Sequence, residues 1–164
     1  SPKEIEVYPG DVVDILATMD INDFGGQRTA QLIVRDLHLS SETQVAYEEM
    51  RRRYAEIKAG APITEDEYPT REDFGTVYNF IRRRARFGED EFTVREMLMR
   101  DDFVESVGYV KLRIILTVLL ELNLVGMTET DDEKYAFKLH YQQKHTDLEK
   151  SAILRKLRAS MRKG

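Results

Sequence analysis

The stretch INDFGGQRTAQLIVRDL, residues 21–37, predicts a tight turn that leads into a β-strand. Apolar and polar residues alternate in AQLIVRD (30–36) and, more loosely, in DVVDILATMD (11–20). Two such runs joined by a Gly-Gly loop predict a β-hairpin. Because a lone hairpin is marginally stable in water, we expect further strands or a covering helix. The nearby candidate for another strand is KEIEVY (3–8).

The composition is that of an ordinary globular protein with one or two small domains. The chain has 164 residues, of which 41% are apolar and 34% charged. It has no cysteine, which excludes disulfides and thiolate chemistry and agrees with a reducing compartment. The printed sequence opens with no export leader, and its longest apolar run, 114–120, is too short to span a bilayer. We therefore expect a cytoplasmic protein with no membrane partner.

The net charge of −5 argues against indiscriminate nucleic-acid binding, but the charge is unevenly distributed. Residues 1–68 hold seven Lys/Arg and fourteen Asp/Glu, whereas residues 69–164 hold eighteen and sixteen. The last fifteen residues carry six basic side chains and no acidic one. Any attraction to polyanions must therefore be local.

The pattern divides the chain into a hairpin region (1–40), a linking helix with a linker (41–69) and a third segment (70–164). The linking helix is predicted to begin at Ser40 or Ser41 as N-cap and to end at Gly60. The polar, proline-marked stretch APITEDEYP (61–69) is the expected domain boundary.

The third segment carries the clearest helix signals. Thr70 with Asp73, and Thr93 with Glu96, are predicted capping boxes that each begin a helix. A turn is expected over 101–108, then an apolar helix through Leu122, then two strands at 124–129 and 134–139 with TDDE as the hairpin tip. The order helix–helix–helix–hairpin is typical of a winged helix. The predicted fold class is therefore α+β: a small antiparallel hairpin region, a linking helix, and a winged-helix-like domain with a hairpin wing.

We predict no catalytic residue, metal site or cofactor in this chain. Its three histidines, His38, His140 and His145, lie in no carboxylate-rich motif. The acidic pairs at 101–102 and 131–132 fall in predicted turns, where Asp bonds to the local backbone. No glycine-rich phosphate loop and no nucleophile motif is present.

Two regions are candidates for nucleic-acid binding. A run of arginines ends the helix that begins at Thr70, and it exceeds what the helix dipole favours there, so it predicts a phosphate or acidic-peptide site: Arg82, Arg83, Arg84 and Arg86. In the hairpin, Phe24, Arg28 and Arg35 combine a ring with cations, as in single-strand binders. The alternative for Phe24 is that it plugs the end of a small barrel.

Four further cations are candidates for binding a protein partner. Lys111 and Arg113 lie on the expected third helix, which is otherwise too apolar to read base edges in a major groove. Arg155 and Arg158 lie in the basic tail, which is either an amphipathic helix or a frayed terminus.

Three stretches resemble the C-terminal part of RecJ-type single-strand-specific exonucleases. Residues 11–37 resemble the last strands of the OB-type domain that follows the family's nuclease core, 54–83 resemble a helix end followed by P-(S/T)-R-(E/D)-D-F-(x2)-VY, and HTDLEKS (145–151) resembles a motif near the C-terminus. The first pattern is met by Asn22, Phe24, Gly26, Arg28, Gln31, Leu32, Ile33, Val34 and Asp36.

This resemblance implies that residues 1–40 are the end of an OB-type sheet whose first strands lie upstream. The family's DHH motif is absent, so its manganese- or magnesium-dependent hydrolysis cannot be assigned to any residue here. What the resemblance implies for this chain is accessory: binding of single-stranded DNA, or of a repair partner such as single-strand-binding protein.

Two other hypotheses remain open on the sequence. A free-standing winged-helix regulator would read duplex DNA as a dimer, and the apolar third helix counts against it. Alternatively, residues 40–164 would only brace a nuclease core and bind no ligand.

Overall fold

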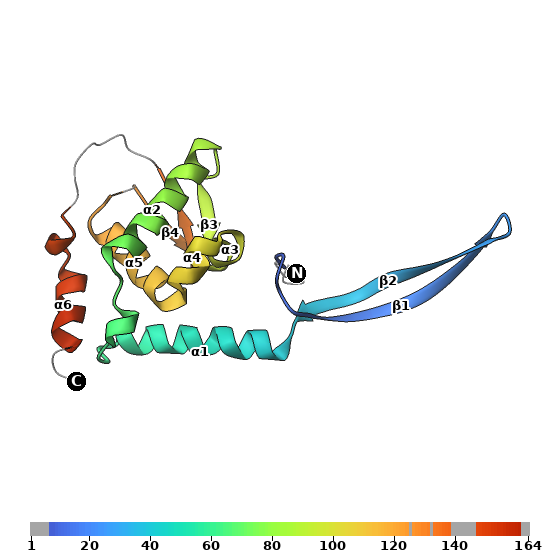
Figure 1. Cartoon of the computed structure of the whole chain (residues 1–164), viewed down its shortest axis with the longest axis horizontal. Helices are drawn as coiled ribbons and strands as arrows, with labels where there is room; N and C mark the ends of the chain where they lie inside the picture. The colour runs from blue at the N-terminus through green and yellow to red at the C-terminus, as the bar shows by residue number, and fades with distance from the viewer. Residues whose placement is uncertain (1–6, 125, 132, 139–146, 162–164) are drawn as a thin grey trace. The chain divides into compact units, whose positions relative to one another are not determined.

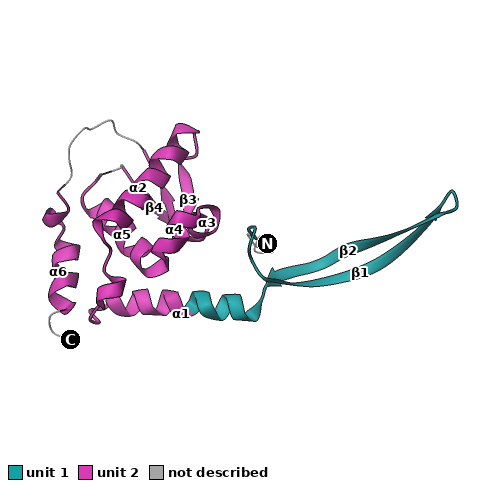
Figure 2. Cartoon of the chain, viewed as in Figure 1, with its two compact units in different colours: residues 1–48 teal, residues 49–164 magenta. Residues whose placement is uncertain are grey.

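The computed structural model describes residues 7–124, 126–131, 133–138 and 147–161 (Figure 1). Its contacts divide the chain into two compact units, 1–48 and 49–164, which are coloured separately in Figure 2. The division falls inside a helix, α1 (Ser41–Lys58).

The first unit contains the predicted hairpin. Strands β1 (Val13–Phe24) and β2 (Gln27–Leu39) pair antiparallel. Gly25 and Gly26 join them with φ of +61° and +80°, the left-handed values that a tight hairpin turn requires and that glycine adopts without strain. In the described part of the chain this sheet has two strands. The further strand expected at 3–8 lies mostly outside the described residues.

One face of this hairpin is apolar and open to solvent. Cross-strand partners share a face, and the pairs Met19–Leu32 and Ile21–Ala30 place apolar side chains together. Met19 is 70% exposed and Leu32 69%. Among the described residues of the first unit, nothing buries this apolar surface.

The second unit includes the linker that the sequence marked as a domain boundary. Ile63 is buried, and its amide donates to the Ser160 hydroxyl over 3.3 Å. Arg53 donates two hydrogen bonds of 2.7 Å to the Glu67 carboxylate and holds the pKa of Glu67 below its ordinary value. These contacts place residues 61–69 within the second unit, whereas the sequence suggested that units separate there.

The fold class is α+β, as predicted. The second unit contains a three-stranded antiparallel sheet in the order β3-β5-β4. Its elements after α1 are η1 (Glu65–Glu67), α2 (Arg71–Arg86), β3 (Glu91–Thr93), α3 (Val94–Arg100), α4 (Asp102–Val107), α5 (Tyr109–Glu121), β4 (Thr128–Asp131), β5 (Lys134–Ala136), η2 (Leu148–Lys150) and α6 (Ala152–Met161).

Both predicted capping boxes are confirmed. The Thr70 hydroxyl accepts from the amide of Asp73, and the Thr93 hydroxyl accepts from that of Glu96, each over 3.1 Å. In both boxes the acidic side chain accepts in return from the threonine amide. The starts of α2 and α3 are thus set by local sequence.

The prediction of a turn over 101–108 is wrong, because most of this segment forms the short helix α4. The Asp101 carboxylate caps this helix, and Val104 and Val107 face the core. The helix–helix–helix–hairpin order is therefore present with one helix added. Strand β3, which the sequence did not indicate, pairs with β5.

The wing hairpin is shorter than expected. Strand β4 begins at Thr128 rather than at 124, after Gly126 with φ of +52°. The expected tip at 130–133 overlaps the ladder, because Asp131 pairs with Lys134.

The basic tail forms the amphipathic helix α6, one of the two alternatives for it. Leu154 and Leu157 are buried. Glu121, the last residue of α5, accepts from the amides of Ala152 and Ile153 over 2.8 and 3.3 Å. This carboxylate therefore caps the first two amides of α6 and joins α6 to α5.

The second unit offers a matched pair of phenylalanines for testing its core. Phe92 is 1% exposed and its ring lies 5.4 Å from that of Phe80, whereas Phe87 is 82% exposed. We expect Phe92→Ala to lower the free energy of unfolding by about 3–5 kcal/mol and Phe87→Ala by less than about 0.5 kcal/mol. Urea unfolding followed by circular dichroism measures both. Equal losses in the two variants would contradict this core.

Candidate nucleic-acid interface

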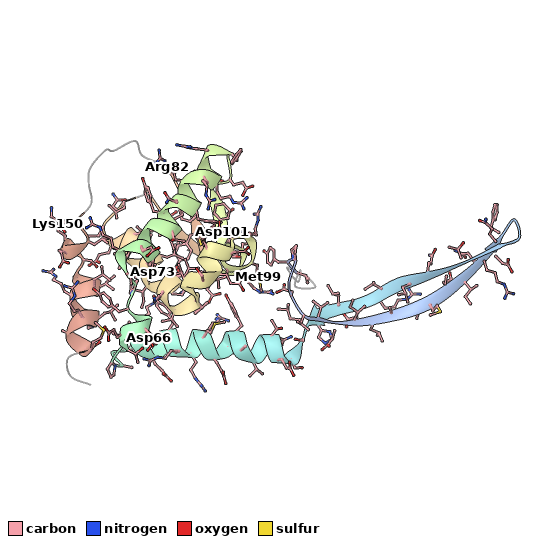
Figure 3. All side chains as sticks on the ribbon, in the orientation of Figure 1. Asp66, Asp73, Arg82, Met99, Asp101 and Lys150 are labelled. Carbon is pink, nitrogen blue, oxygen red and sulfur yellow. The ribbon has the colours of Figure 1, made fainter. Side chains whose placement is uncertain are left out.

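An open cleft of about 470 Å³ lies between α2 and α4. We call it the arginine cleft, because three arginines are among the residues that line it: Thr76, Asn79, Arg82, Arg83, Arg86 and Phe103. Figure 3 labels Arg82 on α2 and Asp101 at the start of α4, which mark the two helices that form it.

The helical repeat of α2 explains why these side chains come together. Positions 76, 79, 82, 83 and 86 recur every three or four residues and therefore lie on one face. The other face buries Phe74, Val77 and Ile81 in the core. The apolar pattern that anchors α2 thus also directs its cations outward.

Three of the four predicted arginines line this cleft, and they differ in their partners. Arg83 donates to the Asp101 carboxylate over 2.8 Å. Within the described residues, Arg82 and Arg86 make no ion pair and no side-chain hydrogen bond, so both guanidinium groups are available. Arg84 lies elsewhere, 3.5 Å from Glu89 and over the ring of Phe80.

Asp101 organises the wall of the cleft that α4 supplies. One carboxylate oxygen accepts from the amides of Phe103 and Val104 over 3.0 and 3.2 Å, and the other accepts from Arg83. The same side chain therefore fixes the start of α4 and orients one arginine. Phe103, two residues after the cap, is 69% exposed and turns its ring to solvent.

Sequence reasoning missed Phe103, Thr76 and Asn79. The signal for Phe103 was present, because Val104 and Val107 at helical spacing are both buried and leave position 103 on the outer side. Treating 101–108 as a turn hid that spacing.

The hairpin candidates are not gathered into one site. Phe24 is 91% exposed beside the turn. Arg28 forms an ion pair of 3.4 Å with Asp23, on the face of the hairpin opposite to that of Phe24. Arg35 donates to the Thr18 hydroxyl over 3.1 Å, beside the register shift between Leu16 and Ala17 and away from the turn.

The four candidates for partner binding are also dispersed. Lys111 bonds to Asp73 over 3.1 Å. Arg113 is 7% exposed and lies in the core. Arg158 donates to Glu149 and to the Tyr68 hydroxyl, whereas Arg155 is exposed and has no ion pair within the described part of the chain.

Arg113 is held inside the second unit by aromatic and acidic neighbours. Its guanidinium lies 4.8 Å from the centroid of the Tyr54 ring, and its Nη1 lies 4.0 Å from Glu133. Burial lowers the pKa of Arg113, but Tyr135, Tyr109, Tyr54 and Glu133 together raise it above the ordinary value. Burial and the hydrogen bond to Glu133 raise the pKa of Tyr109. Arg113 therefore contributes a buried cation to the fold.

No three His, Asp or Glu side chains of the described residues gather where they could hold a metal ion. In the same part of the chain, no helix has the length and apolar character needed to cross a membrane.

The two roles of Asp101 can be separated by substitution. Asp101→Ala removes the cap of α4 and the bond to Arg83, so we expect the free energy of unfolding to fall by about 1–2 kcal/mol. Asp101→Ser keeps a capping oxygen and should lose less than about 1 kcal/mol, since the half-exposed pair with Arg83 contributes little. Urea unfolding measures both, with Asp102→Ala as the neighbouring control. Equal losses for Ala and Ser would remove the capping role.

Comparison of the chain with protein-family models, with curated proteins and with solved structures finds no match.

Proposed function

We propose that the arginine cleft binds single-stranded DNA and that the chain is a non-catalytic, C-terminal part of a RecJ-type exonuclease of DNA repair. The observation that carries the binding proposal is that Arg82 and Arg86, which make no ion pair with any described residue, share one open cleft with the exposed ring of Phe103. Its place in an exonuclease rests on the three stretches of sequence resemblance. The manganese or magnesium of that enzyme would be bound outside this chain.

The chemistry of the cleft matches that of single-strand binders. Such proteins hold phosphates with cations and stack bases on aromatic rings, and both kinds of group line this cleft. Each guanidinium can donate two parallel hydrogen bonds to one phosphate. The hydroxyl of Thr76 and the amide of Asn79 add donors and acceptors for base edges.

The apolar character of α5 is an argument for single-stranded rather than duplex DNA as the ligand. Eight of its thirteen residues are buried, so few side chains are left to reach a major groove. A free-standing winged-helix regulator would need such side chains on its third helix. The proposal therefore assigns binding to α2 and α4.

An acidic protein segment, such as the tail of a single-strand-binding protein, is the competing ligand for the same arginines. It would use the charges of Arg82 and Arg86 but would need no stacking surface. The contribution of Phe103 therefore distinguishes DNA from an acidic peptide.

We expect Arg82→Gln with Arg86→Gln to weaken binding of a labelled oligothymidine and to reduce its salt dependence. Each phosphate contact contributes about −0.7 to the slope of log K against log salt, so losing two should make the slope shallower by about 1.4. Fluorescence anisotropy across a salt series measures this. Arg84→Gln and Arg52→Gln are the matched controls, because neither side chain lines the cleft. Unchanged binding by the double variant would exclude the cleft.

Phe103→Ala should cost about 1–3 kcal/mol of oligothymidine binding at every salt concentration while leaving the slope unchanged, because stacking involves no counterion release. Duplex DNA of the same length is the competitor. If an acidic peptide binds through Arg82 and Arg86 while the oligonucleotide does not, a protein partner replaces DNA as the ligand.

A further inference from the structure

A second hollow of the 49–164 unit is chemically unlike the arginine cleft. It has a volume of about 280 Å³ and is formed by α1, α5, α6 and the residues after α1. We call it the apolar cavity, because most of its lining is apolar: Tyr54, Ile57, Ala61, Ile114, Ile153 and Leu157.

The three hydroxyl groups that line the apolar cavity already use their hydrogens as donors. Thr117 donates to the Arg113 carbonyl over 2.8 Å and shares a hydrogen bond of 2.9 Å with the Tyr54 hydroxyl. Ser160 donates to the Leu157 carbonyl and accepts from the Ile63 amide. A carboxylate or carbonyl that entered the interior would lose its water without finding a free hydroxyl donor, so the interior favours an apolar group.

The charged residues of the lining are all of one sign. Lys58 comes from α1 and Lys156 from α6, and both are exposed. Neither lysine makes an ion pair within the described ranges, and the lining holds no acidic residue. The wall thus combines an apolar interior with two ammonium groups that reach solvent.

From this combination we infer that the apolar cavity binds a small amphipathic carboxylate, whose apolar body fills the interior and whose anionic end meets Lys58 and Lys156. A cavity of about 150 Å³ holds a benzene ring, so 280 Å³ suits an apolar body of about ten carbons. This inference does not depend on the proposed function, because the two sites share no residue.

Straight-chain carboxylates test both halves of this site. We expect affinity to rise about fourfold for each methylene from hexanoate to decanoate, as each adds buried apolar surface, and to level off once the chain exceeds the cavity. The readout is the chemical shift of ¹³C-labelled methyl groups of Ile57, Ile114 and Leu157 in the whole chain. No saturable shift with decanoate would overturn the site.

Two sets of variants give the decisive comparison. Lys58→Met with Lys156→Met should weaken decanoate about fivefold and leave decanol unchanged, with Lys150→Met as the matched control outside the lining. Ala61→Leu fills the cavity and should abolish binding of both compounds, whereas Ala159→Leu on the exposed side of α6 should not. Equal binding of decanol and decanoate, or no effect of Ala61→Leu in a folded variant, would overturn the assignment. Oligothymidine binding should be the same in all these variants.

Discussion

Burial of α5 is the constraint on which the second unit depends. This helix is apolar on nearly every side, and a helix of that kind must be surrounded. Helices α2, α3 and α4 contact it, the Tyr54 hydroxyl of α1 bonds to its Thr117, and its terminal Glu121 caps α6. The carboxyl-terminal half of α1 and the tail helix therefore belong to the same core as the capped helices.

The same constraint explains the buried Arg113. Only one charged residue in the middle of α5 lies in the core, and enclosing the helix encloses that cation as well. The ring of Tyr54 and the carboxylate of Glu133 reduce the cost of desolvating it. A polar residue that looked like a binding group in the sequence is thus a part of the packing.

Features set by local chemistry could be predicted from the sequence, whereas those set by distant contacts could not. The Gly-Gly turn and the two threonine caps depend on neighbouring residues and were read correctly. Strand β3 forms because β5, more than forty residues later, supplies its ladder. Likewise, Ile63 is buried and its amide bonds to Ser160 of α6, nearly a hundred residues later, a contact that no linker pattern reveals. Of the candidate cleft, the arginines could be found from sequence, but the ring beside them required the correct assignment of α4.

The hairpin of the first unit has a different energetic character from the core around α5. Its strands run for twelve and thirteen residues, yet its apolar face, including Met19 and Leu32, is left in water. Little buried surface opposes the opening of its ladder, so separating the strands costs little free energy. The backbone amides of this hairpin should consequently exchange their hydrogens with solvent long before those of α5, which open only when the second unit unfolds.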